Sequence, residues 1–126
     1  MPGIYEIFVT TQFAAAHALT GHGGDCARLH GHNWGIEVAV RCTKLDELGM
    51  ALDFGDLEAG VKEILQGLDH YHLNELPVFR EVNPTAENLA RFLYQELGRR
   101  LNSEMISVSR VKVSETKGVG AVYWEE

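Results

Sequence analysis

Residues 32–42 read HNWGIEVAVRC, and this stretch decides the fold. Apolar side chains take every second position and polar ones fall between them, with Trp34, Ile36, Val38 and Val40 opposite Glu37 and Arg41. Such alternation is typical of a strand with one face on a core and the other in solvent. Sheets of this kind are usually antiparallel. The stretch therefore predicts an antiparallel sheet that is covered on one face.

Further elements follow on both sides of this strand. Residues 4–17, IYEIFVTTQFAAAH, are rich in β-branched and aromatic side chains and predict the preceding strand. Apolar residues at helical spacing predict a helix over 56–67, and Thr85 has the character of the N-cap of a second helix. Residues 106–116 and 120–125 predict two strands joined as a hairpin by KGVG.

The predicted order is β-β-α-α-β-β in a single domain, 1–126, of the α+β class. Both helices are expected on one face of the antiparallel sheet. Four strands leave two open edges and one bare face, and natural sheets protect or pair such edges. We therefore expect other copies of the chain to complete the sheet.

The composition narrows the classes of partner. A formal net charge of −7, with no basic run longer than Arg99–Arg100, argues against a protein that follows nucleic-acid phosphates. The N-terminal residues lack the pattern of a signal peptide, and no stretch is apolar enough to span a membrane. These features predict a cytoplasmic protein that binds a small molecule.

Three of the six histidines form a pattern. His30 and His32 lie two residues apart, so an extended chain places them on one face. His17 ends the first strand with the parity of Phe13 and Ala15. If the first two strands form a hairpin, their ends bring the three imidazoles together. Three neutral imidazoles without a fourth protein ligand are typical of a catalytic zinc site.

The thiol of Cys26 has two interpretations. It could be a fourth ligand, which would close the site as a structural zinc centre; however, structural thiolates usually come in C-x-x-C pairs, and the chain has none. It could instead be a reactive thiolate favoured by nearby cations such as Arg28. A disulfide with Cys42 is not expected, because nothing else indicates secretion.

Asp69 and His70 are adjacent in the segment LDHYHLN, in the order carboxylate and then imidazole. A carboxylate that holds an imidazole supports it as a proton carrier. Adjacent side chains rarely point the same way, so a simple polar turn is the alternative. His22 and His72 are expected at the surface.

Glu115 continues the parity of Val111 and Val113 on the apolar face of the third strand. A carboxylate in such a position is costly unless donors meet it, and a planar heterocycle with paired N–H groups would supply them. Fraying at the end of the strand is the alternative interpretation.

Six segments between Phe13 and Thr116, in this order, resemble the 6-pyruvoyltetrahydropterin synthase superfamily: FAAAH, CARLHGHNW, MALDFGDL, LDHYHLN, PTAENLA and VKVSET. The resemblance implies the tunnelling fold, or T-fold, closed into a barrel in homohexamers of two stacked trimers with sites between subunits. The spacing C-x-x-x-H-G-H is similar to that of the bacterial 6-carboxytetrahydropterin synthases of queuosine biosynthesis.

The resemblance also implies the reaction. It is the zinc-dependent conversion of 7,8-dihydroneopterin triphosphate to 6-carboxy-5,6,7,8-tetrahydropterin, with release of acetaldehyde and triphosphate. The resemblance assigns His17, His30 and His32 as zinc ligands and Cys26 as the general base. Asp69 and His70 form the proton relay. Glu115 anchors the amino-pyrimidine edge of the pterin and is also counted in the relay, with Thr85 nearby. Arg28 and Lys117 are candidates for contacts with the triphosphate.

Two rival functions remain at this point. One is the pyruvoyl-forming reaction, which eliminates triphosphate without cleaving the side chain. The other is a non-catalytic zinc-binding oligomer, closed by Cys26 as a fourth ligand.

Overall fold

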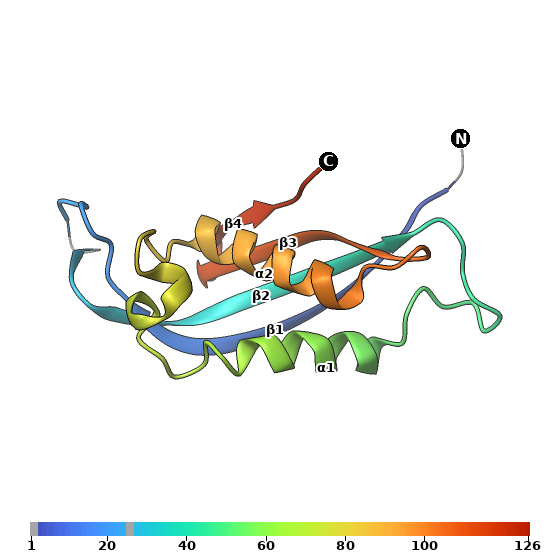
Figure 1. Cartoon of the computed structure of the whole chain (residues 1–126), viewed down its shortest axis with the longest axis horizontal. Helices are drawn as coiled ribbons and strands as arrows, with labels where there is room; N and C mark the ends of the chain where they lie inside the picture. Colours follow the sequence, from blue (N-terminus) through green and yellow to red (C-terminus); the bar gives the residue numbers. More distant parts are fainter. Residues whose placement is uncertain (1–2, 25–26) are drawn as a thin grey trace.

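The two N-terminal strands form one long hairpin that positions everything else. A computed structural model describes residues 3–24 and 27–126. The bounds of its strands and helices are β1 Tyr5–His17, β2 His30–Cys42, α1 Phe54–Leu65, α2 Ala86–Leu101, β3 Ser107–Thr116 and β4 Val119–Tyr123. Two short 3₁₀ helices, η2 Leu73–Glu75 and η3 Pro77–Phe79, precede α2. The strands form one antiparallel sheet in the order β1-β2-β3-β4, so the predicted order and class are confirmed (Figure 1).

The alternation in β2 works as the sequence predicts. Its apolar positions are almost fully buried, whereas Glu37 and Arg41 lie on the opposite face. β1 pairs with β2 from Tyr5 opposite Cys42 to His17 opposite His30. Residues directly opposite each other share a face of the sheet, so this register fixes which side chains of the two strands meet.

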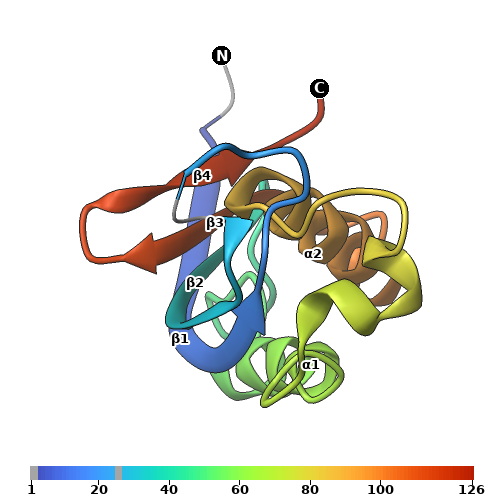
Figure 2. The ribbon, with the colours of Figure 1, turned by 90° about the vertical axis from the view of Figure 1, so that its left-hand side faces the viewer.

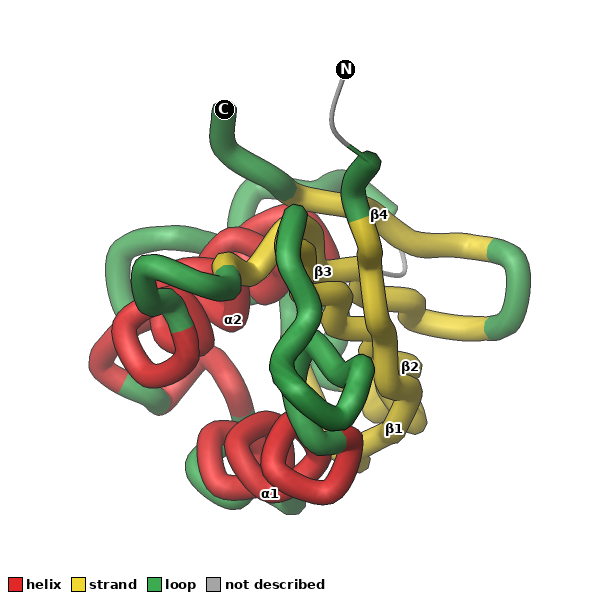
Figure 3. Tube along the Cα trace, turned by 90° about the vertical axis from the view of Figure 1, so that its right-hand side faces the viewer, coloured by secondary structure: helices red, strands yellow, loops and turns green. Residues whose placement is uncertain are grey.

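Both helices pack on one face of the sheet, as Figures 2 and 3 show from the two ends. α1 begins at Phe54, two residues earlier than predicted, because the Asp53 carboxylate accepts from the main-chain N–H groups of Gly55 and Asp56. α2 begins directly after Thr85, whose side-chain oxygen accepts from the Asn88 N–H, as the N-cap prediction requires. In the described part of the chain, neither helix has the length and apolar character needed to cross a bilayer.

The edge of β1 is partly covered by the chain's own segment 70–72. The His70 N–H donates to the Ala14 carbonyl over 2.6 Å, and the Ala16 N–H donates to the Tyr71 carbonyl over 3.1 Å. The expectation of a fully open edge is therefore wrong at this end of the strand. The opposite face of the sheet carries no helix of the described chain, and its closure into a barrel by other copies stays a prediction.

Candidate metal centre and active site

The hairpin brings three imidazoles to one point. His17 lies directly opposite His30, and His32 lies opposite Ala15, so the three histidines share a face. One nitrogen from each ring lies within 4.8 Å of the others, and the ring centroids are 4.5–5.2 Å apart. The predicted convergence of these side chains is confirmed.

Main-chain carbonyls orient two of the rings. His17 Nδ1 lies 2.7 Å from the Pro84 oxygen, and His30 Nδ1 lies 2.6 Å from the Arg28 oxygen. A carbonyl only accepts, so each Nδ1 carries the hydrogen and each Nε2 keeps its lone pair. Histidines that bind metals are commonly held in this way.

The nitrogen atoms and the protonation state of this cluster both suit a metal ion. The Nε2 atoms of His17 and His32 are buried and have no hydrogen-bond partner in the described structure. Burial lowers the pKa of both imidazoles, and for His17 the two neighbouring rings lower it further. Low pKa values keep the rings neutral, which is the form that binds a metal. Nitrogen ligands of this kind suit zinc better than magnesium or calcium.

Trp34 is the floor of this centre. Its side chain is fully buried, and its ring meets those of His17 and His32 edge to face at centroid distances of 4.9 and 5.1 Å. Its Nε1–H donates to the Ala15 carbonyl over 3.2 Å. From the sequence, Trp34 is predicted only as a core residue. The available signal was its parity with His32, two residues away on the same face.

Glu115 lies beside the centre and is half-buried at its rim. Its Oε2 is 3.6 Å from His32 Nε2, which is beyond hydrogen-bond distance, and its side chain is 29% exposed. β3 extends through Glu115, so fraying does not explain its position, although its pairing with β4 shifts between Ser114 and Thr116. The carboxylate can therefore accept from a ligand. Thr85 caps α2 with its side-chain oxygen, as described above.

Asp69 and His70 do meet, although adjacent side chains usually diverge. Asp69 Oδ2 lies 2.9 Å from His70 Nδ1, while Oδ1 accepts from the Ala14 N–H over 2.9 Å. The bonds from Ala14 and His70 lower the pKa of the Asp69 carboxyl. His70 adopts a φ of 65°, which is uncommon for a residue with a side chain. Its imidazole is 81% exposed.

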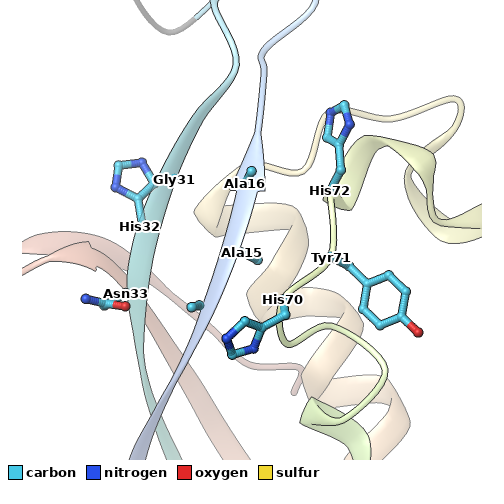
Figure 4. A pocket seen from close by; sticks show the side chains of 9 residues that line it. Ala15, Ala16, Gly31, His32, Asn33, His70, Tyr71 and His72 are labelled. Carbon is cyan, nitrogen blue, oxygen red and sulfur yellow. The ribbon is translucent and has the colours of Figure 1, made fainter.

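His70 and His32 both line a shallow cavity of about 470 Å³. Its lining consists of four small residues of the hairpin, Ala14, Ala15, Ala16 and Gly31, and five larger ones, His32, Asn33, His70, Tyr71 and His72 (Figure 4). Of the three clustered histidines, only His32 reaches it. His70 and Tyr71 point in opposite directions (Figure 4).

The other candidates have different positions. His22 is exposed as expected. The His72 side chain is 34% exposed, with its Nδ1 3.4 Å from Glu75 Oε1 and its Nε2 inaccessible, so the surface prediction for His72 holds only in part. Arg28 has an exposed side chain, and its carbonyl is the partner of His30. Cys42 is a buried free thiol. Cys26 lies outside the described residues.

Comparisons with known proteins agree with this arrangement. The profile of the family described as 6-pyruvoyl tetrahydropterin synthase matches residues 6–126. The chain is 33% identical over 124 residues to the 6-carboxy-5,6,7,8-tetrahydropterin synthase of Rickettsia bellii, with 83% of this chain and 89% of that one covered. It is 31% identical over 102 residues to the 6-pyruvoyl tetrahydrobiopterin synthase of Dictyostelium discoideum, with 79% and 73% covered.

A solved structure has the same fold. The 6-pyruvoyl tetrahydropterin synthase of Caenorhabditis elegans superimposes with a TM-score of 0.86 at 24% identity, and 98% of this chain and 97% of that chain are covered. The architecture of the single chain is therefore that of the predicted T-fold.

Proposed function

The chain belongs to the 6-pyruvoyl tetrahydropterin synthase family, and on that premise we propose that it is a zinc-dependent carbon–carbon lyase. Its substrate is 7,8-dihydroneopterin triphosphate, and its products are 6-carboxy-5,6,7,8-tetrahydropterin, acetaldehyde and triphosphate. Queuosine biosynthesis in the cytoplasm is the proposed setting. The observation that carries the proposal is a cluster of three imidazoles, two with buried unpartnered Nε2 atoms, beside the Glu115 carboxylate.

His17, His30 and His32 are the proposed zinc ligands, each through Nε2. When bound, the ion acts as a Lewis acid that lowers the pKa of hydroxyl groups on the substrate side chain. The hydrogen bonds to the carbonyls of Pro84 and Arg28 support this role, because they keep the Nε2 lone pairs of His17 and His30 available.

The remaining steps fall to side chains of the protein. Cys26 is the proposed base that removes a proton from the substrate side chain. Asp69 holds His70 by its Nδ1, so that the exposed Nε2 side of this imidazole can carry a proton to or from the pterin. Glu115 accepts from the N–H groups of the amino-pyrimidine edge. The lowered pKa of Asp69 supports its role, because the carboxylate then stays ionised while it orients the imidazole.

Further contacts with the substrate are proposed for two residues. Thr85 stands at the N-terminus of α2 near the pterin; its oxygen serves as the helix cap, but its hydroxyl hydrogen remains free to donate. Arg28 offers an exposed guanidinium for the triphosphate.

A second copy of the chain is part of the proposal. His70 is largely exposed, and its cavity includes only one of the three proposed metal ligands. Both features are expected of a site between subunits. We propose that the bare sheet faces and edges associate into a barrel, in a homohexamer built as two stacked trimers.

The test is incubation of the zinc-loaded protein with 7,8-dihydroneopterin triphosphate, followed by mass spectrometry of the pterin and an assay for acetaldehyde. A carboxylated tetrahydropterin with one equivalent of acetaldehyde supports the proposal. A pyruvoyl product without acetaldehyde would assign the chain to the second candidate reaction, which the likeness to the Dictyostelium relative favours. Zinc binding without any turnover would leave the structural zinc oligomer.

A further inference from the structure

Two asparagine side chains hold the main chain directly after His17. The Oδ1 of Asn74 accepts from the Ala18 N–H over 2.9 Å, and its Nδ2 donates to the Ala18 carbonyl over 2.8 Å. Asn83 makes the same pair of bonds with Thr20, over 2.8 and 2.9 Å. Each carboxamide thus replaces the two main-chain bonds that a neighbouring strand residue would make.

These bonds begin where the sheet ends. The pairing of β1 with β2 stops at His17 and His30, so beyond this point the sheet no longer holds Ala18 and Thr20. Strand ends without partners fray easily. The two asparagines therefore extend the ordered part of β1 past the proposed metal ligand.

Asn83 is itself fixed to the start of α2. Its carbonyl accepts from Asn88 Nδ2 over 2.8 Å and from the Thr85 N–H over 2.9 Å. The next residue, Pro84, provides the carbonyl that orients the His17 imidazole. The segment Asn83–Pro84 thus contacts the last residue of β1 through the ring of His17, and the chain just beyond β1 through the main chain of Thr20.

We propose that Asn74 and Asn83 are positioning residues of the metal centre. They fix the Ala18–Thr20 main chain, so that His17 keeps its Nδ1 on the Pro84 carbonyl and its Nε2 toward the other two imidazoles. No hydrogen bond found in the described structure joins either asparagine side chain to an imidazole, so the effect passes through the main chain. The inference rests on the proposed zinc site and adds these two residues to it.

The test compares Asn74→Ala and Asn83→Ala with a matched control, Asn102→Ala. Asn102 Oδ1 accepts from the Val108 N–H over 2.7 Å at the far end of α2, so its loss also removes a bond between a side chain and the main chain. Two quantities are measured on the full chain: the zinc dissociation constant, by competition with a chelating indicator, and the visible spectrum of the cobalt(II) form, which reports coordination geometry.

The two variants near the site should bind zinc about 10–100-fold more weakly and show an altered cobalt spectrum, because that is the loss seen when the groups that orient metal ligands are removed. The control should lose thermal stability but keep wild-type affinity and spectrum. If either alanine variant fails to fold, Asn74→Asp or Asn83→Asp replaces it. Aspartate keeps the size and one acceptor oxygen of asparagine, but it places a second oxygen where the Nδ2 donor faces the carbonyl of Ala18 or Thr20. Wild-type affinity and spectrum in the folded variants would overturn the positioning role. A wild-type chain that binds no zinc would overturn the proposed function itself.

Discussion

The buried nitrogen of His32 leads to a prediction in which stability and metal binding change in opposite directions. The side chain is 15% exposed, and its Nε2 is buried without a hydrogen-bond partner in the described structure. The Oε2 of the Glu115 carboxylate lies 3.6 Å away, beyond hydrogen-bond distance. In the absence of metal, this nitrogen should therefore destabilise the folded chain.

The substitution His32→Leu removes the nitrogen and fills a similar volume. A buried polar atom without a partner costs about 1–3 kcal/mol. The metal-free variant should accordingly have a free energy of unfolding about 1–3 kcal/mol higher than that of the metal-free wild type. Free zinc at 100 times its dissociation constant stabilises the wild type by about 2.7 kcal/mol, and the variant should gain almost none of this. Zinc should thus remove or reverse the advantage of the variant.

The assay is urea unfolding at one fixed chain concentration, once with a chelator and once with excess zinc. His22→Leu is the control: His22 is exposed, and its ring contacts the Gly24 N–H over 3.0 Å at the surface, so the change should stay within about 0.5 kcal/mol in both conditions. A chelated His32→Leu chain that is no more stable than the wild type would refute the reasoning, because the nitrogen would then be satisfied in the folded protein.

Three further predictions address the proposed chemistry. Cys26→Ala should abolish turnover while the zinc content, measured by atomic absorption, stays near one ion per chain; loss of zinc as well would make Cys26 a ligand. Asp69→Asn should lower the free energy of unfolding at neutral pH, and the difference from wild type should disappear on acidification. The reason is that the folded-state pKa of Asp69 lies below its ordinary value of 3.8, so the carboxylate stabilises the fold only where it is ionised. Parallel pH profiles of unfolding for variant and wild type would contradict this. Chelation of the zinc-loaded wild type should lower its midpoint of thermal unfolding by roughly 10 °C, as followed by circular dichroism, and an unchanged midpoint would argue against a metal in the folded chain.

The sequence allowed the hairpin and the histidine cluster to be predicted because one physical rule governs both. A strand buried on one face has a period of two, and a slip of one residue would expose its whole apolar set, so the register of such strands is strongly specified. Phe13 opposite Trp34 satisfies that condition, and His17 then falls opposite His30. The start of α2 was predictable for a similar reason, because Thr85 is a local cap.

Contacts between distant loops could not be predicted in this way. Segment 70–72 is held beside β1 by main-chain hydrogen bonds, and such bonds leave no periodic pattern in the sequence. The positive φ of His70 turns its ring back to Asp69. The side-chain hydrogen bonds of Asn74 and Asn83 join residues that are 56 and 63 positions apart in the sequence, so they depend on the completed fold. The barrel and the hexamer stay predictions.

The choice between an enzyme and a structural zinc protein depends on the fourth ligand. In the part of the chain that the structure describes, the group able to hold a metal has three members, and all are imidazoles. A structural site needs four protein ligands, whereas a catalytic site keeps one position for substrate. Glu115 already faces His32 from the rim, where it can serve a ligand without closing the shell. The structural alternative assigns the fourth position to Cys26, so the zinc content of Cys26→Ala separates the two functions even before a substrate is tried.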